Sequence, residues 1–318
     1  MNRKQLAGLC FILAVSVAAF SRAVAPPAQK LAEPATVVIP FELVNRHILI
    51  KVRINNSDPL SFILDTGDKF SIVNLARAKA LGLNLQGEIN VGGAGAGTLR
   101  GSLVRDATLT VLGLEGDKEP VVLALPLDNI ASKLGHVGDG IIGSDFMKKF
   151  VVEIDYPARV LRLHDKDKFV YSGSGDSIPV RLNSAGHAII PAAAAIEGHA
   201  AIKGNFVVDI GSGGSLVLHN PVVEAEHLPN PDQKTIRAFG GAGTGGKITG
   251  RIGRIAALTI GKFRVEDPVT LFSSDKAGAF ASTEQQGNIG QRILSKFTIF
   301  LDYAHDRIIL EPNAPSRI

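Results

Sequence analysis

The feature that most constrains the fold of this 318-residue chain is that its sequence is written twice. Corresponding residues recur at a nearly constant separation, which is 144 residues from Asp65 to Asp209 and 147 residues from Gly143 to Gly290. Because whole blocks recur in one order, the chain predicts two similar structural units. The blocks of the first half are IPFELVNRHILIKVRINNSDPLSFILDTGDKFSIVN from Ile39, GGAGAGTLRG from Gly92 and DGIIGSDFMKKFVVEIDYPARVLRL from Asp139; those of the second are IPVRLNSAGHAII from Ile178, GNFVVDIGSGGSLVLHN from Gly204, GGAGTGGKITG from Gly240 and GNIGQRILSKFTIFLDYAHDRIIL from Gly287.

Each half has the pattern of β structure. Residues 47–54 alternate between apolar and polar side chains, NNSDP has turn chemistry, and LSFIL at residues 60–64 is typical of a returning strand. Neither half alternates strands with long helices, which argues against a parallel βαβ sheet. We therefore expect an all-β fold, in which two similar and mostly antiparallel lobes form closed barrels related by a pseudo-two-fold axis.

Two smaller patterns refine this expectation. SDFMKKF and QRILSKF each follow a glycine and predict short helices, and the segments after them predict hairpins. PAAAAIEGHAA, from Pro191, has helix-forming composition, but its place in the repeat predicts a strand and a turn instead. The resulting domain prediction is an N-terminal lobe at 36–166, a polar linker at 167–177 and a C-terminal lobe at 178–313.

The first 23 residues are predicted to be a secretory signal peptide. Arg3 and Lys4 precede an apolar stretch of about fifteen residues, which is short for a membrane span. Cleavage after Ala23 or after Ala19 is compatible with the small residues there, and an uncleaved N-terminal anchor is the alternative. We expect a periplasmic or secreted protein that is not stably inserted in a membrane once this segment is removed.

Charge and cysteine content exclude several classes of protein. The full chain has 34 basic and 30 acidic residues, and loss of residues 1–23 removes three basic ones, leaving 31 against 30. Without a basic run interleaved with aromatic residues, nucleic acid is not an expected partner. The single cysteine, Cys10, lies in the predicted signal peptide, so the remaining chain has no disulfide.

The most informative motif is an aspartate that ends an apolar run in each half. FILDTGDKF contains Asp65 and FVVDIGSGG contains Asp209. A pseudo-two-fold axis would bring both carboxyl groups together, where they would share a proton and hold a water between them. One carboxylate would accept a proton from the water while the other protonates a peptide carbonyl oxygen. Gly67 and Gly211 would let the two loops approach closely.

These residues resemble those of the retropepsin-like and pepsin-like aspartic peptidases, and the resemblance extends over roughly residues 36–313. The motifs that carry it are Asp65-Thr66-Gly67, Asp209-Ile210-Gly211-Ser212, IIGSDF at Ile141 and, in part, NIGQRI at Asn288. The resemblance implies catalytic Asp65 and Asp209, loop support from Thr66, Gly67, Gly211 and Ser212, and an extended peptide bound in a cleft between the lobes. It also implies flaps over that cleft, with Gly93, Gly95, Gly241 and Gly243 as the flap candidates, and neither a cofactor nor a metal.

Three residues depart from the pattern of that family. Ile210 has no hydroxyl with which to cross to the other lobe, as Thr66 can. Asp68 adds a third carboxylate beside the first loop, and it would raise the pKa of the dyad if it points inward. Arg292 stands where the family has an acidic or amide residue, which the first half keeps as Asp145.

Other patterns were weighed as rival sites. Asp155 and Asp302 are also repeated, but each precedes a hairpin turn with Arg159 or Arg307 nearby, which favours a turn or an ion pair. GAGTGG from Gly241 fits a dinucleotide motif without the βαβ context that the motif requires. His187 and His199 are too far apart to form a local zinc pair, and the sequence has no GxSxG nucleophile motif.

The sequence therefore predicts an exported aspartic endopeptidase that acts on polypeptides as a monomer. The alternative is a catalytically impaired relative that binds peptides in the same cleft, with Ile210 and Asp68 as the marks of lost catalysis. A structural envelope protein without a site is the third possibility, and the repeated Asp loops argue against it.

Overall fold

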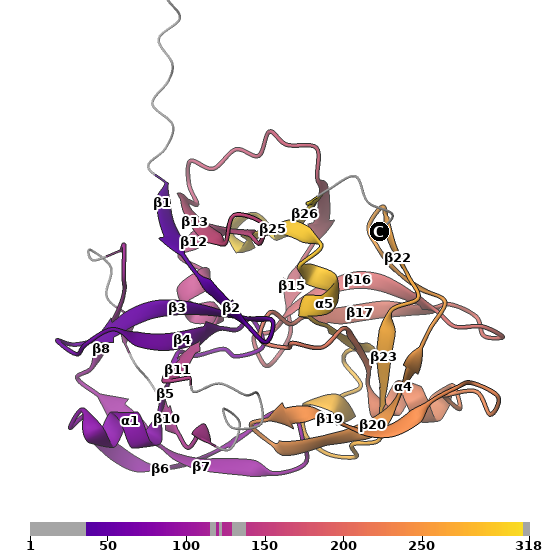
Figure 1. Cartoon of the computed structure of the whole chain (residues 1–318), viewed down its shortest axis with the longest axis horizontal. Helices are drawn as coiled ribbons and strands as arrows, with labels where there is room; N and C mark the ends of the chain where they lie inside the picture. Colours follow the sequence, from indigo (N-terminus) through magenta and orange to yellow (C-terminus); the bar gives the residue numbers. More distant parts are fainter. Residues whose placement is uncertain (1–35, 115–118, 121–122, 129–137, 314–318) are drawn as a thin grey trace, which may run out of the picture. The chain divides into compact units, whose positions relative to one another are not determined.

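A computed structural model describes residues 36–114, 119–120, 123–128 and 138–313, which all belong to one compact unit (Figure 1). The predicted signal peptide at residues 1–23 lies outside the described residues. Within them, no helix is long and apolar enough to cross a membrane. We call the elements up to β13 the first lobe and those from β14 onward the second lobe.

The first lobe contains thirteen described strands and two short helices. The strands are β1 (Val37–Pro40), β2 (Glu42–Val44), β3 (His47–Ile54), β4 (Leu60–Leu64), β5 (Ile72–Asn74), β6 (Asn84–Gly92), β7 (Thr98–Arg105), β8 (Thr108–Val111), β9 (Glu119–Pro120), β10 (Leu123–Leu125), β11 (Gly140–Ile142), β12 (Phe150–Asp155) and β13 (Val160–Asp165). The helices are α1 (Leu75–Ala80) and α3 (Ser144–Met147).

The second lobe has the same kinds of element among its described residues. Its strands are β14 (Asp176–Pro179), β15 (Arg181–Leu182), β16 (Ala188–Ala195), β17 (Ile202–Val208), β18 (Leu216–Leu218), β19 (Ile236–Gly243), β20 (Gly246–Arg254), β21 (Ala257–Ile260), β22 (Phe263–Glu266), β23 (Val269–Ser273), β24 (Gly287–Ile289), β25 (Phe297–Asp302) and β26 (Arg307–Pro312). Its helices are α4 (Asn220–Ala225), α5 (Gln291–Leu294) and the 3-10 turns η1 (Ala279–Ala281) and η2 (Tyr303–His305).

Each lobe is built on one large sheet, and the two sheets have the same strand order. The first runs β6-β7-β10-β5-β11-β4-β3-β8-β9 with β2 beside β3, and the second runs β19-β20-β23-β18-β24-β17-β16-β21-β22 with β15 beside β16. Every strand of the first sheet thus has a counterpart at the same place in the second. The repeated sequence blocks lie on these corresponding strands.

A third sheet is shared between the lobes. Its order is β1-β13-β12-β25-β26-β14, so that each lobe contributes three strands and β12 pairs with β25 at the centre (Figure 1). The central register joins Glu153 to Phe300, with Val152 and Ile154 paired beside it. Residues of both lobes also lie in one continuous apolar cluster, which includes Val152, Ile154 and Leu301. The lobes are therefore packed through a common core.

The alternating pattern of the sequence explains which faces are buried. In β3 the polar Lys51 and Arg53 are exposed, whereas the apolar residues between them are buried. β4 buries Phe62 and Leu64 completely, because it lies between β3 and β11 within the sheet. Burial of this apolar surface supplies the main favourable free energy of folding. It also fixes the register of β4, and hence the position of the residue that follows it.

The fold class expected from the sequence is confirmed. The chain is all-β, and only four of the strand pairings among the described residues are parallel. The predicted strands at 47–54 and 60–64 and the short helices after Gly143 and Gly290 are present. The stretch from Pro191 lies in strand β16, so its place in the repeat outweighs its helix propensity.

Two details differ from the expectation. The described pairings leave β6 and β9, and likewise β19 and β22, at the two ends of their sheets, so neither sheet closes into the expected barrel. The helices α1 and α4 were not predicted. α1 begins at Asn74, whose side chain accepts a hydrogen bond from the Ala76 N–H at 2.9 Å, and α4 has Pro221 in its first turn.

Candidate active site

Asp65 and Asp209 occupy the same place in their sheets. Each follows a buried strand, β4 or β17, that pairs in parallel with the strand next to it. The Asp65 N–H donates to the Ile142 carbonyl at 2.9 Å, and the Asp209 N–H donates to the Ile289 carbonyl at 3.0 Å. The sheets thus position both aspartates through the backbone, independently of their side chains.

The two aspartates meet across the interface between the lobes. A Cβ placed on Gly67 would lie 3.0 Å from Asp65 Oδ1 and 3.3 Å from Asp209 Oδ1, so both carboxylates contact one glycine. A Cβ on Gly211 would lie 2.0 Å from Asp65 Cγ, a distance at which no side chain can exist. The close approach therefore requires glycine at position 211, and it brings the carboxyl groups within the range in which their charges interact.

Thr66 joins the loops from the first lobe. Its hydroxyl donates to the Val208 carbonyl at 2.5 Å and accepts from the Ile210 N–H at 3.0 Å. Both contacts cross from one lobe to the other, and Thr66 is completely buried. Thr66 therefore fixes the backbone on both sides of Asp209.

The second loop, where Ile210 lacks a hydroxyl, is joined by residues that the sequence analysis missed. The Gln291 amide donates to the Ile210 carbonyl at 2.8 Å, and Gln291 Oε1 accepts from the Tyr156 hydroxyl at 2.7 Å. Tyr156 belongs to the first lobe and Gln291 begins α5 of the second. This chain of hydrogen bonds takes the place of the missing threonine contact. In the sequence, the residue that could have indicated this contact is Gln291 itself, directly after the NIG segment.

Asp209 has a side-chain donor that Asp65 does not share. Asn288 Nδ2 donates to Asp209 Oδ2 at 2.8 Å, and the side-chain oxygen Oδ1 of Asn288 lies 2.8 Å from His219 Nε2. The register of β24 against β17 and of β11 against β4 makes Ile141 the counterpart of Asn288 in the first lobe. An isoleucine cannot donate, so the hydrogen bonding at the two carboxylates is asymmetric.

The electrostatics follow this asymmetry. Burial raises the pKa of Asp65 well above its usual value, and the charges of Asp68 and Asp209 raise it further. Burial also raises the pKa of Asp209, but the Asn288 hydrogen bond, nearby His187 and the backbone of Ser212 oppose the rise. Asp65 is also stabilised as a carboxylate by backbone hydrogen bonds, among them the Gly67 N–H at 2.6 Å, which lower its pKa. The Asn288 donor and His187 act on Asp209 alone, so they favour the charged form of Asp209.

Asp68 is a third acidic group at the site. Burial raises the pKa of its carboxyl to about 7, with further increases from the charges of Asp209 and Asp145. Its charge in turn raises the pKa of Asp65. Asp68 is half-buried, and its effect on the pKa of Asp65 is the one expected of the inward alternative. The corresponding residue of the second loop is Ser212, which has no charge and accepts from the Gly214 N–H at 3.3 Å.

The glycine-rich hairpins β6–β7 and β19–β20 meet at their tips. The Gly97 N–H donates to the Gly245 carbonyl at 2.7 Å, and the Gly245 N–H donates to the Ala94 carbonyl at 2.8 Å. Cβ atoms on Gly95 and Gly243 would lie 2.6 Å from atoms of the opposite hairpin, and one on Gly93 would overlap Thr244. Three of the four flap candidates are thus at the tip contact.

The fourth flap candidate lies elsewhere. Gly241 has a φ of +132° at an irregularity in the pairing of β19 with β20, and a Cβ there would meet only Ile248. Gly245, which the sequence analysis did not select, takes its place at the contact. The second lobe adds a further contact to the first hairpin, because the Ala279 N–H of η1 donates to the Gly93 carbonyl at 2.9 Å.

The comparison with known families bears on the first lobe. Residues 50–146 match the family model described as aspartyl protease. The match supports the aspartic peptidase family. The matched residues of this aspartyl protease model include the whole Asp65 loop and IIGSDF, and they end before the second lobe. A search of curated proteins gave no match.

The rival acidic pair has a structural role outside this aspartyl-protease-like site. Asp302 accepts from Arg307 at 2.7 Å, as the sequence suggested. Asp155 accepts from the Ala158 N–H at 2.9 Å and pairs with Arg162 at 3.0 Å, rather than with Arg159. Within the described ranges, no group of three or more His, Cys, Asp or Glu residues could hold a metal ion.

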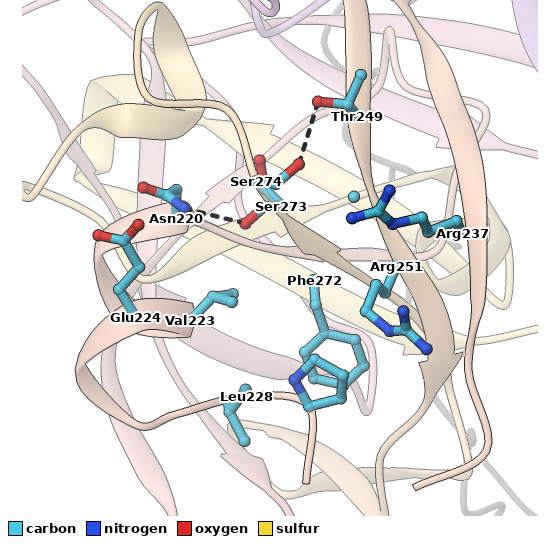
Figure 2. A pocket seen from close by; sticks show the side chains of 12 residues that line it. Asn220, Val223, Glu224, Leu228, Arg237, Thr249, Arg251, Phe272, Ser273 and Ser274 are labelled. Carbon is cyan, nitrogen blue, oxygen red and sulfur yellow. Dashed lines mark hydrogen bonds between the residues drawn. The ribbon is translucent and has the colours of Figure 1, made fainter. Parts of the chain in front are cut away.

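A hollow of about 680 Å³ lies at a different place, between α4 and the β19–β20 hairpin (Figure 2). Figure 2 shows Arg237 and Arg251 on one side of it and Glu224 on the other. Glu224 is paired with Lys276 at 3.1 Å, and none of the lining residues belongs to the Asp65 or Asp209 loop. The charged residues around the hollow are unlike the two carboxyl groups that meet at Gly67 and Gly211, so the candidate active site is the pair of Asp loops.

Proposed function

We propose that this chain is an exported aspartic endopeptidase, which hydrolyses peptide bonds with a water activated by Asp65 and Asp209. The observation that carries the proposal is the approach of Gly211 to Asp65, where an added Cβ would lie 2.0 Å from the carboxyl carbon. Such an approach costs conformational freedom and desolvates a carboxyl group. It is therefore best explained by a reaction that needs both carboxyl groups on one water.

The asymmetry of the site assigns the first steps. Asp209, which accepts from Asn288, is the carboxylate that takes a proton from the water. The water oxygen then bonds to the peptide carbonyl carbon, and the proton on Asp65 goes to the carbonyl oxygen. Transfer of a proton from Asp209 to the amide nitrogen lets the C–N bond break and releases the amine. Loss of a gem-diol proton to Asp65 restores the starting state.

The substrate class follows from the place of the two Asp loops between the lobes and of the two hairpins whose tips meet. We infer an extended polypeptide as the substrate, held in the manner of an added strand beneath the two glycine-rich hairpins. The hairpin tips contact each other through the Gly97–Gly245 and Gly245–Ala94 hydrogen bonds, so they must separate before a peptide enters. No cofactor or second subunit is needed, because one chain supplies both aspartates.

The test uses the purified chain and a mixed peptide library from acid to neutral pH. Wild type is compared with Asp65→Asn and Asp209→Asn, which keep the shape of each side chain and remove its charge. We expect cleavage by the wild type and a loss of at least about a thousandfold in both variants, since neither carboxyl can act alone. Asn56→Asp, at an exposed turn, is the matched control and should cleave as the wild type does. Cleavage that survives both substitutions would refute the mechanism.

The second candidate function is that of a catalytically impaired peptide-binding protein. Ile210 and Asp68 are the observations that favour it, because they depart from the family pattern in both loops. Against it, the Tyr156–Gln291 chain supports the loop that Ile210 leaves without a hydroxyl contact. Peptide binding measured by calorimetry, without cleavage at any pH, would favour this second function.

Export and domain organisation are part of the same proposal. We propose that residues 1–23 direct the chain to the periplasm or the outside of the cell, and that 36–166 and 178–313 are domains joined by 167–177. Intact-mass analysis of the protein after expression in a bacterium tests the first point. A mass that retains residues 1–23 would instead support the uncleaved anchor.

A further inference from the structure

The two lobes contain a pair of histidines at corresponding positions. Leu49 pairs with Ile63 and Ile189 pairs with Val207, and each of these partners lies two residues before an Asp of the site. The same register makes His47 the counterpart of His187. The first lies at the start of β3 and the second lies directly before β16. The repeat thus places a histidine at the start of, or directly before, each strand that pairs with a strand leading to an Asp loop.

Each histidine contacts the Asp loop of the opposite lobe. A Cβ on Gly213, in the Asp209 loop, would lie 3.3 Å from His47 Cε1. On the other side, the His187 ring hydrogen-bonds to the backbone of Gly67 in the Asp65 loop. A Cβ on the neighbouring Gly186 would lie 3.2 Å from the Lys69 side chain. In each lobe, the segment that contains the histidine therefore contacts the Asp loop of the other lobe.

The turn before His187 is rigid, so the ring has a defined place. The His187 N–H donates to Asn183 Oδ1 at 2.8 Å, and the Asn183 N–H donates to the His187 carbonyl at 3.0 Å. Gly186 has a φ of +88°, which favours glycine over other residues. Ser184 in the same turn donates to Glu284 at 3.0 Å. The ring itself lies 3.5 Å from the Asn183 amide, measured from His187 Nδ1 to Asn183 Nδ2, so the turn also orients the ring.

We propose that His187 is a positioning residue for the Asp65 and Asp209 pair: it holds the Asp65 loop from the second lobe and, when protonated, stabilises the negative charge on Asp209. The role rests on the proposed function, because it is defined by the pair of carboxyl groups. It differs from the role of His47, which is almost completely buried and faces the uncharged Gly213.

The charges around His187 give the sign of the pH effect. Burial lowers the pKa of His187, and the charges of Asp209 and Glu284 together with the Gly67 contact offset part of this decrease. The charge of His187 lowers the pKa of His219, the neighbouring Gly186 lies beside Lys69, and Asp65 and Asp68 belong to the loop that the ring contacts. The ring is thus neutral at neutral pH and becomes a cation on acidification. A cation beside Asp209 opposes protonation of that carboxylate, so the acid side of the activity range is extended.

The contact can be tested without any activity. The pKa of His187 is followed by histidine NMR from about pH 4 to about pH 8, with the resonance assigned from the His187→Gln spectrum. In Asp209→Asn we expect this pKa to fall by roughly half a unit to one unit, since a neighbouring negative charge is lost. The exposed His227 is the internal control, and its resonances should be the same in both proteins at each pH. A His187 pKa that does not change in Asp209→Asn overturns the proposal.

The activity arm separates the hydrogen bond from the charge. His187→Gln keeps an N–H donor for Gly67 but has no charge, so we expect kcat/KM near neutral pH within about twofold of wild type. Its acid limb should move to higher pH by about one unit, because the cation is absent. His187→Leu should lower kcat/KM at every pH, and His227→Gln should change neither property. An unmoved acid limb in His187→Gln refutes the charge role. If no peptide is cleaved at any pH, the proposed function fails, and the NMR titration still decides the contact.

Discussion

The two Asp loops share one backbone geometry, yet each is held by different side chains. The first loop reaches across with the Thr66 hydroxyl, which contacts the backbone on both sides of Asp209. The second loop has Ile210 at that place, and Gln291 with Tyr156 supplies its contact to the first lobe. A repeated fold can therefore keep its loops together while the residues that connect them change. Only the backbone geometry, and the glycines that permit it, must remain.

The lobes also differ in charge at one pair of equivalent positions and in hydrogen bonding at another. The first has Asp68 where the second has Ser212, and the first has Ile141 where the second has Asn288, the donor to Asp209. Both differences act in the same direction, because each makes Asp65 the better proton holder of the pair. Two halves of similar sequence thereby gain different proton affinities, which general acid and base catalysis needs.

After the loss of either carboxyl group, the largest expected effect comes from adding one methyl group to each loop in turn. In Gly211→Ala the new Cβ would lie 2.0 Å from Asp65 Cγ, so the loops must separate. We expect cleavage to fall by roughly a hundredfold or more, since a displacement of about 1 Å has this effect on catalysis. Gly67→Ala meets Asp65 Oδ1 at 3.0 Å and Asp209 Oδ1 at 3.3 Å, longer distances than the 2.0 Å at Gly211, and should lose less activity. Comparison of kcat/KM for both variants is the measurement, and equal losses would contradict the asymmetry of the approach.

The next effect compares the two connections between the lobes. Thr66→Val leaves the Val208 carbonyl and the Ile210 N–H without their partner, and we expect a loss of about 2 to 4 kcal/mol in the free energy of unfolding. Gln291→Leu leaves the Ile210 carbonyl and the Tyr156 hydroxyl unpaired and should cost about 1 to 3 kcal/mol. Urea unfolding followed by circular dichroism measures both. Tyr156→Phe is the milder control, because it removes the hydroxyl donor and leaves only its acceptor, Gln291 Oε1, without that partner.

The strands that lead to the site and the pairing of the two Asp residues could be predicted from the sequence, because they depend on local patterns and on the repeat. Alternation between apolar and polar residues located β3 and β4, and the repeat then placed Asp209 opposite Asp65. The parts that escaped prediction depend on contacts between distant segments. Gln291 looked like an ordinary first residue of a short helix until its contact with Tyr156 was known. Asn288 looked like an imperfect match to a family motif, although it is the donor to Asp209.

Other outcomes depended on packing that no local pattern contains. Whether Asp68 points inward could not be read from its neighbours in sequence, since both orientations suit a turn. Gly241 and Gly245 belong to one glycine-rich run, but Gly241 lies within β19, whereas Gly245 lies in the turn between β19 and β20 and contacts the tip of the opposite hairpin. In each case a register or a side-chain direction decided the result.

A third prediction concerns a substitution that gives the first loop, at position 68, the same charge as the second has at position 212. Asp68→Ser copies the residue at 212 and removes a negative charge that raises the pKa of Asp65. The pKa of Asp65 should therefore fall, and the alkaline limb of kcat/KM should move to lower pH by about one unit. The pH–rate profile is the measurement, with Asp58→Ser at an exposed turn as the control. A limb that does not move would show that Asp68 is electrostatically separate from the dyad.

The same variant changes the dependence of stability on pH. The Asp68 carboxyl has a pKa of about 7 when folded, above its ordinary value, so the folded chain keeps a proton that the unfolded chain releases. The free energy of unfolding of the wild type should consequently fall as pH rises from about 4 to about 7. In Asp68→Ser this fall should be smaller, as measured by urea unfolding at several pH values.

The smallest expected effect is a gain of stability, and it tests the comparison in the opposite direction. Ser144 and Tyr303 are the counterparts of Gln291 and Tyr156, but the serine is too short for the equivalent contact. Ser144 Oγ and the Tyr303 hydroxyl are both buried and make no hydrogen bond within the described part of the chain. Ser144→Gln would supply a side-chain amide to the Tyr303 hydroxyl. This contact would copy the one between Gln291 and Tyr156.

We expect Ser144→Gln to raise the free energy of unfolding by about 1 kcal/mol, the usual net value of one buried hydrogen bond. A double-mutant cycle with Tyr303→Phe separates the new contact from the effect of a larger side chain, because the gain should vanish without the hydroxyl. A gain that persists in Tyr303→Phe would mean that the glutamine only fills space. A loss of stability would mean that the core around α3 cannot admit it, and that the two lobes differ in packing as well as in hydrogen bonding.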